Sequence, residues 1–140
     1  MKGYSEREVF TMREITLWQR ATRRIDLLPS LNSVRCHELA RAVGRFLDLP
    51  YQDGFYGFVD HSWLWLAPVP RTIGRLGFPN ILDVYAVGGL PMVRLVACDA
   101  PSLPHVGWSY RPGEERTDID AAMVDDLVVR LSSWDEERRK

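Results

Sequence analysis

The sequence predicts an α+β fold in which N-terminal helices pack on a small antiparallel sheet and a C-terminal helix follows. Three observations lead to this prediction: helical spacing of apolar residues early in the chain, aromatic and β-branched segments in the middle, and helical spacing again near the C-terminus. Because helices and strands are segregated along the chain, an antiparallel sheet is favoured over alternating βαβ units. A chain of 140 residues suits one domain, which we expect over residues 1–134, with a charged tail over residues 135–140.

The first and last helices each carry a start signal. Residues 5–24 have roughly helical apolar spacing, and Ser5 followed by Glu8 matches a capping box, in which two side chains satisfy each other's backbone donors. Thr117 with Asp120 can start the last helix. The apolar face of that helix consists of Ala121, Val124, Leu127, Val128 and Leu131.

A further helix is predicted to begin at Asn32 or Ser33, either of which can cap it, and to end at about Leu47. Its expected buried stripe is formed by Leu39, Ala40, Val43, Phe46 and Leu47. Cys36 then falls at the third or fourth helical position. Unpaired backbone N–H groups and the positive end of the helix dipole stabilise a thiolate in that first turn. Glu38 opposes this effect unless its side chain points away.

Three strands are expected in the middle of the chain, over residues 55–67, 80–87 and 91–98. Two prolines end the first strand, and a Gly-Gly pair closes the second. The segment 99–113 holds three prolines and few periodic signals, so it is predicted as a long loop.

Side-chain alternation along these strands singles out two polar residues. His61 shares its strand face with two tryptophans, and Asp83 shares its own with Ile81 and Tyr85. A polar side chain among large apolar neighbours needs a partner, which suggests that His61 and Asp83 are paired. An imidazole oriented by a carboxylate can take the proton of a nearby thiol, and Cys36 is the candidate thiol.

Three segments of the chain carry a resemblance to a known family: RCHELARAVGRFLDLP, DHSWLWL and NILDVYA. Over about residues 32–87 they resemble the Cys–His–Asp core of the transglutaminase-like superfamily, within the wider papain-like fold. The resemblance implies that Cys36 is the nucleophile, that His61 is the general base and then the acid, and that Asp83 orients the imidazole. It also implies acyl transfer on an amide through a thioester, ending in hydrolysis, deamidation or amine transfer to a protein or peptide.

The pattern departs from the family at two positions. Arg35 precedes the cysteine where a small residue is common, and Val84 follows the aspartate where proline is common. These departures motivate an alternative, a catalytically inactive module on the same fold, such as a bacterial or phage accessory protein that binds another protein. The candidates for an oxyanion-binding donor are Gln19, Gln52 and the backbone N–H of Cys36.

Each residue also has a structural interpretation. A cysteine on an amphipathic helix is often a small core residue, a histidine on an aromatic strand is often a satisfied core residue, and an aspartate can cap a turn. We interpret Cys98 as a packing residue and His37 as a surface or supporting residue. A metal site built from Cys36, His37, Cys98 and His105 lacks the usual ligand spacing, so we expect neither a metal nor a cofactor.

Charge and hydropathy exclude several classes of partner. Eighteen basic residues against 19 acidic ones provide no field of one sign that would bind nucleic acid or an anionic membrane. No apolar run approaches the roughly 18–20 residues needed to cross a bilayer. The N-terminal residues are too polar for a secretory signal, so we expect a cytoplasmic protein, where a disulfide between Cys36 and Cys98 is disfavoured. The substrate and the oligomeric state stay open.

Overall fold

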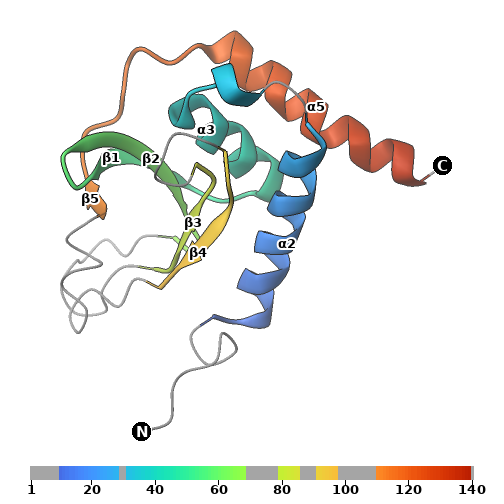
Figure 1. Ribbon diagram of the computed structural model, residues 1–140, viewed down its shortest axis with the longest axis horizontal. Helices are drawn as coiled ribbons and strands as arrows, with labels where there is room; N and C mark the ends of the chain where they lie inside the picture. The colour runs from blue at the N-terminus through green and yellow to red at the C-terminus, as the bar shows by residue number, and fades with distance from the viewer. Residues whose placement is uncertain (1–9, 29–30, 69–78, 86–90, 98–109, 140) are drawn as a thin grey trace, which may run out of the picture.

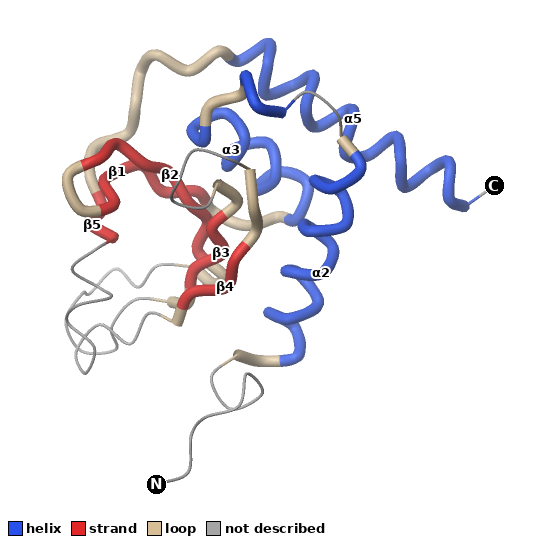
Figure 2. Tube along the Cα trace, viewed as in Figure 1, coloured by secondary structure: helices blue, strands red, loops and turns tan. Residues whose placement is uncertain are grey.

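The computed structural model describes residues 10–28, 31–68, 79–85, 91–97 and 110–139. Over these residues it confirms the α+β fold, with two N-terminal helices, then an antiparallel sheet, then a C-terminal helix. The helices are α2 (Met12–Leu27), α3 (Cys36–Leu47) and α5 (Ala121–Arg139), with a short 3₁₀ turn at Leu31–Ser33. Figure 1 shows the helices gathered on one side of the molecule and the strands on the other, and Figure 2 shows the same separation by colour.

The sheet of the described residues has five strands in the order β4-β3-β2-β1-β5, and all neighbouring pairs are antiparallel. The strands are β1 (Tyr51–Tyr56), β2 (Val59–Trp65), β3 (Ile81–Asp83), β4 (Arg94–Val96) and β5 (Tyr110–Pro112). β3 and β4 lie inside the predicted strands 80–87 and 91–98. β5 lies inside the segment predicted as a long loop, because a three-residue strand that pairs with β1 has no periodic signal of its own.

The single strand predicted over residues 55–67 is wrong, because this part of the chain forms the hairpin of β1 and β2. The hairpin turns at Gly57, whose backbone adopts the left-handed φ of 63° that glycine tolerates best. Gly54 lies within β1, where an added Cβ would come 2.1 Å from the carbonyl oxygen of Arg111 on β5. This glycine therefore permits a close approach of two strands, although in the sequence it resembles a turn residue.

Among the described residues, the helix α2 begins at Met12, later than the predicted start. Thr11 is extended and caps α2: its hydroxyl accepts a bond from the Glu14 N–H at 3.1 Å, while its own N–H donates to the Glu14 carboxylate at 2.9 Å. This is the predicted kind of capping box, six residues further along the chain. The Ser5–Glu8 pair lies outside the described residues. The helix also ends three residues beyond the predicted end, at Leu27.

The predicted start of the next helix is also wrong. Asn32 and Ser33 belong to the 3₁₀ turn, so they do not cap α3, whose N-cap is Arg35. Cys36 is therefore the first residue of the helix rather than the third or fourth. The predicted end at Leu47 is confirmed, and Asp48 follows in a left-handed conformation.

The last helix begins at Ala121 with Asp120 as its cap, so Thr117 of the predicted start signal does not start it, and the helix is longer than expected. Asp120 accepts a bond from the Met123 N–H at 3.1 Å, as a helix cap does. α5 continues to Arg139, so most of the segment predicted as a charged tail is helical. In the described part of the chain, none of the helices is long and apolar enough to cross a membrane.

The main core lies between the sheet and the helices, where α3 packs against both β2 and α5. Leu39, Ala40, Val43 and Leu47 are buried as predicted, and Phe46 is partly buried. Gly44 makes the contact between α3 and β2 close, since a Cβ there would lie 2.9 Å from a methyl group of Leu64. A second cluster lies on the other face of the sheet and consists of Trp63, Trp65, Ile81 and Tyr110.

Candidate active site

Cys36 occupies the N-terminus of α3 as a free, partly buried thiol. The N-cap residue Arg35 makes no side-chain capping bond to the helix. The first backbone N–H groups of a helix have no acceptor within the helix, and the N-cap side chain does not accept from them here. These donors and the positive end of the helix dipole therefore favour negative charge at the sulfur.

His61 and Asp83 form the buried pair that the sequence predicts. His61 Nε2 lies 2.8 Å from Asp83 Oδ2. The β2–β3 ladder covers two residue pairs, Leu64 with Leu82 and Trp65 with Ile81, so His61 lies beyond its end. The imidazole can therefore face both the carboxylate and a group outside the sheet.

Two further groups hold the Asp83 carboxylate in place. The Tyr110 hydroxyl donates to Oδ2 at 2.8 Å, and the Tyr85 backbone N–H donates to Oδ1 at 3.0 Å. Tyr110 comes from β5, at the opposite edge of the sheet from β4, and its ring packs edge-on against Trp63. Sequence reasoning missed Tyr110, because a short strand inside a loop-like segment leaves no pattern that predicts the contact.

Two imidazoles act on the pKa of the Cys36 thiol: His37, whose Nδ1 lies 3.5 Å from the sulfur, and His61. Burial by itself raises the pKa of Cys36, but hydrogen bonds with the two imidazoles outweigh this effect and lower it to about 6. Burial by itself lowers the pKa of His61, whereas the Asp83 carboxylate and the Cys36 thiolate raise it to about 9. Because His61 Nε2 is bound to Asp83, Nδ1 is the ring nitrogen left for the sulfur. The arrangement favours a thiolate–imidazolium pair near neutral pH.

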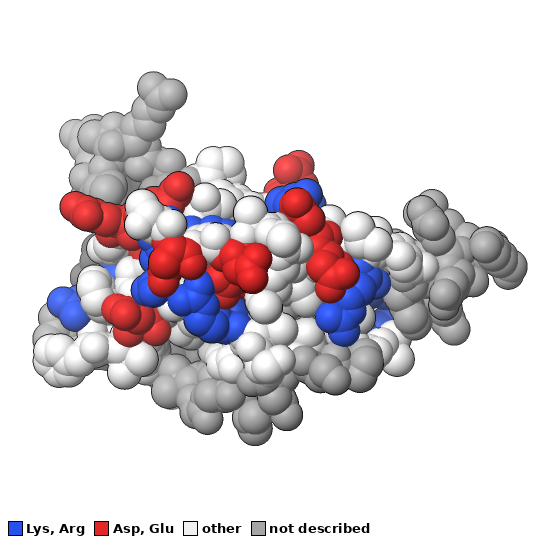
Figure 3. Space-filling view, turned by 90° about the horizontal axis from the view of Figure 1, so that it is seen from above, with Lys and Arg blue, Asp and Glu red and all other residues white. Residues whose placement is uncertain are grey.

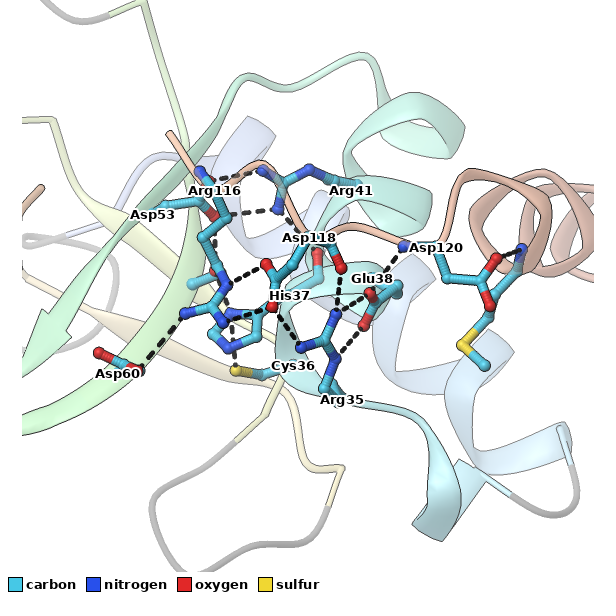
Figure 4. Close-up of polar contacts among 12 residues, drawn as sticks. Arg35, Cys36, His37, Glu38, Arg41, Asp53, Asp60, Arg116, Asp118 and Asp120 are labelled. Atoms are coloured by element: carbon cyan, nitrogen blue, oxygen red, sulfur yellow. Dashed lines mark hydrogen bonds and ion pairs between the residues drawn. The ribbon is translucent and has the colours of Figure 1, made fainter. Parts of the chain in front are cut away.

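His37 is not on the surface, so that alternative of the sequence analysis is wrong. It is 6% exposed, and its Nδ1 lies 3.5 Å from the Cys36 sulfur and 2.7 Å from the Ser62 hydroxyl. Ser62 in turn donates to Asp53 Oδ1 at 2.6 Å. Figure 4 shows Cys36 and His37 in contact at the start of α3, with Asp53 and Arg41 further along the same network.

Asp53 is the centre of this network. Arg41 reaches both of its carboxylate oxygens, at 2.9 and 2.5 Å, and the Arg116 backbone N–H donates at 2.9 Å. Burial would raise the pKa of Asp53, but these donors and Ser62 lower it below its usual range. Sequence reasoning missed Asp53 as a site residue because its partners come from three distant segments of the chain.

Glu38 does not oppose the thiolate as an unpaired charge would. Its carboxylate is buried and paired with the guanidinium of Arg35, and it accepts the Asp120 N–H at 3.1 Å. Arg35 also binds Asp118, at 3.0 Å. Figure 3 shows acidic and basic side chains interspersed on one face of the molecule. The helix start therefore carries compensated charges.

Of the three candidate oxyanion donors, the backbone N–H of Cys36 is the best placed. Gln52 is committed elsewhere: its amide donates to the Asp53 and Gly113 carbonyl oxygens at 2.8 and 3.3 Å and accepts from the Trp65 indole at 3.2 Å. Gln19 is exposed on α2. The Cys36 N–H lies at the uncapped end of α3, next to the reacting sulfur.

Within the described ranges, no group of three His, Cys, Asp or Glu residues could hold a metal ion. Cys98 and His105, which completed the metal site considered from the sequence, lie outside those ranges. Comparison with protein-family models, curated proteins and solved structures found no match to the chain. We therefore argue the chemistry of the site from its geometry.

Proposed function

We propose that the protein catalyses acyl transfer on an amide bond, with Cys36 as the nucleophile and His61 as the general base and then the acid. Asp83 positions the imidazole. One observation carries the proposal: a free thiol lies at a helix N-terminus, and its pKa is lowered by two imidazoles, one of which is held by a buried carboxylate. The resemblance to the transglutaminase-like superfamily supports the same three roles.

The reaction proceeds in two halves. The Cys36 thiolate attacks the carbonyl carbon, and the carbonyl oxygen gains negative charge beside the backbone N–H of Cys36. As the C–N bond breaks, His61 gives its proton to the leaving amine and a thioester to Cys36 remains. Water or a second amine then attacks the thioester while His61 takes its proton, and the sulfur leaves as thiolate. Depending on the amide and the acceptor, the outcome is hydrolysis, deamidation or amine transfer.

A second candidate is a non-catalytic protein-binding module on the same fold. The observation that favours it is the exposed apolar surface at the β1–β2 turn, where Phe58 is 93% and Val59 is 68% exposed. The Arg111 guanidinium lies over the rings of Phe55 and Phe58, 5.2 and 5.8 Å from their centres. A non-catalytic role also predicts a fully buried cysteine, whereas Cys36 is partly exposed.

The first test is the pH dependence of alkylation by iodoacetamide, followed at each cysteine by peptide mass spectrometry. Cys98 is the internal control, and His61→Ala is the matched variant. We expect Cys36 to react with a midpoint near pH 6 and to lose this shift without His61. An ordinary midpoint near about 8.5 that ignores His61 contradicts the proposal and directs the search to binding partners.

The second test looks for the thioester itself. Wild type and Cys36→Ser are incubated with a peptide library containing glutamine and other amides, and hydroxylamine is added to intercept the acyl group. We expect hydroxamate products and a transient increase in the mass of the wild-type protein only. Equal hydroxamate yield from Cys36→Ser contradicts a role for the thiol.

A further inference from the structure

We infer that His37 is a second imidazole of the active site and acts as a fixed hydrogen-bond donor to the Cys36 thiolate, its Nδ1 proton held in place by Ser62 and Asp53. The inference rests on the proposed function, because it assigns a second group that stabilises the same thiolate. It starts from the contacts of His37 Nδ1, at 3.5 Å from the sulfur and 2.7 Å from the Ser62 hydroxyl. The direction of each hydrogen bond in this network decides what His37 can do.

The network begins at a carboxylate that can only accept. Arg41 and Asp53 are both buried and form a two-point ion pair, and the Arg116 backbone N–H adds a third donor. These contacts keep Asp53 ionised, as its lowered pKa indicates. An ionised carboxylate has no proton to donate, so Ser62 must donate to it across their 2.6 Å contact.

This assignment fixes the proton on His37. A serine hydroxyl has one proton, and that of Ser62 is used on Asp53. The Ser62 oxygen can therefore only accept from His37, so His37 Nδ1 carries a hydrogen. The conclusion holds for the neutral ring and for the imidazolium alike. The same N–H is shared between two acceptors: the Ser62 oxygen at 2.7 Å and, as the longer arm of a three-centre bond, the Cys36 sulfur at 3.5 Å. Because Nδ1 already carries a hydrogen, it cannot take the thiol proton.

The two imidazoles thus have different roles at the Cys36 sulfur. His61 donates from Nε2 to Asp83, so its neutral form has a free lone pair on Nδ1 that can accept the thiol proton. His37 has the proton on the nitrogen that faces the sulfur. His61 is the group that moves a proton, while His37 lowers the energy of the thiolate by a fixed hydrogen bond.

The other charged or titratable groups around the sulfur do not replace His37. From α3 and its cap, Glu38 is paired with Arg35. From β2 and β3 come His61 and its partner Asp83. Tyr85 follows β3, and its pKa is raised by burial and by the negative charge of Cys36, so its hydroxyl stays neutral. None of these described groups therefore replaces the hydrogen bond that His37 donates to the thiolate.

The test compares His37→Ala with His37→Asn, because the asparagine amide can donate from nearly the position of Nδ1. Iodoacetamide alkylation of Cys36 is followed against pH, with His61→Ala measured in parallel and circular dichroism used to check folding. We expect His37→Ala to raise the pKa of Cys36 by about one pH unit and His37→Asn to restore most of the loss. Ser62→Ala removes the acceptor that keeps the proton on His37 Nδ1, and we expect it to raise the pKa of Cys36 by less than His37→Ala does.

The outcomes separate this inference from the proposed function. If His37→Ala leaves the alkylation profile unchanged while His61→Ala shifts it, the inference is overturned and the proposed function stands. If neither variant shifts the profile, both are overturned. If His37→Asn behaves as His37→Ala does, the effect is one of packing and the donor role is overturned.

A measurement on the wild-type protein tests the tautomer without any variant. The ¹⁵N chemical shifts of the His37 ring report which nitrogen carries the proton. We expect a protonated Nδ1 from about pH 5 to about pH 9, a range over which an ordinary imidazole changes its protonation state. An unprotonated Nδ1 within this range overturns the inference.

Discussion

The two histidines at Cys36 are the same side chain in two different settings. His61 meets a carboxylate directly, at 2.8 Å, whereas His37 meets one through the hydroxyl of Ser62. The direct contact puts a proton on Nε2 of His61 and leaves its Nδ1 free to accept. In His37, the serine instead keeps the proton on Nδ1. The role of each histidine therefore depends on which ring nitrogen its polar partner contacts: Nε2 in His61, which leaves Nδ1 for the sulfur, and Nδ1 itself in His37.

The carboxylates differ as much as the imidazoles do. Asp53 forms its ion pair with the buried guanidinium of Arg41, so its charge is balanced whatever the state of His37. Asp83 forms its ion pair with His61 and takes neutral donors from Tyr110 and the Tyr85 backbone. A buried carboxylate without a permanent cation favours charge on its histidine. This difference explains why the pKa of His61 is raised to about 9.

The largest expected effect comes from removing each imidazole in turn, which tests whether His61 and His37 have different roles. We expect His61→Ala to lower turnover of an amide substrate by about 10²–10⁴-fold, because it removes the group that transfers the proton. His37→Ala removes one hydrogen bond to the thiolate and should cost much less. The measurement is release of ammonia or amine under single-turnover conditions. Equal losses in the two variants contradict the division of roles.

A second prediction concerns the stability supplied by the Asp53 network. Asp53→Asn leaves the buried Arg41 guanidinium without its ionic partner and should lower the free energy of unfolding by about 3–5 kcal/mol. The matched control is Asp125→Asn, which breaks the exposed ion pair with Arg45 and should change stability little. Urea unfolding of both variants measures the difference. Similar losses would show that burial of the Asp53 pair is not decisive.

A smaller effect is expected at the other carboxylate. Tyr110→Phe removes one hydroxyl donor from Asp83 and should lower the free energy of unfolding by about 1–2 kcal/mol. Tyr56→Phe is the control, because its ring packs against Tyr110 with centres 4.9 Å apart. We expect little change there. Thermal unfolding of the two variants provides the comparison, and a larger loss from Tyr56→Phe would contradict it.

The smallest effect is the pH dependence of stability contributed by the thiolate–imidazolium pair. The lowered pKa of Cys36 stabilises the fold at high pH, and this contribution is lost as pH falls through about 6. The raised pKa of His61 stabilises the fold at low pH, and this contribution is lost as pH rises through about 9. Between the ordinary pKa values of the two groups these contributions have opposite slopes and largely cancel in wild type, whereas Cys36→Ser keeps only that of His61. The stability of wild type relative to Cys36→Ser should therefore rise with pH over this range. A difference that does not vary with pH contradicts the pair.

Much of the fold follows from local pattern. The α+β class, the apolar stripe of α3 and the end of that helix at Leu47 depend on residues close together in the sequence, and all are confirmed. The start of α2 shows the limit of such signals. Two capping-box motifs occur six residues apart, and Thr11 rather than Ser5 caps the helix that the structure describes. A local motif therefore predicts that a helix starts nearby, and it leaves the position open.

The residue types of the candidate triad could also be chosen from sequence, because strand alternation put His61 and Asp83 on apolar faces where each needs a partner. The resemblance of three short segments to a family added Cys36 to that pair. The contact between His61 Nε2 and Asp83 Oδ2, at 2.8 Å, agrees with the predicted pairing of these two residues. The catalytic roles stay a proposal that the thiol chemistry will test.

The sequence by itself determined the class of fold, the apolar faces and the order of cysteine, histidine and aspartate along the chain. Tertiary structure alone decided that Cys36 begins its helix, that His37 turns inward to Ser62, and that Tyr110 reaches Asp83 from the edge strand. The physical reason is distance along the chain. Periodicity and capping act over a few residues, whereas these hydrogen bonds join segments 25 or 27 residues apart and form only when the sheet has set its register.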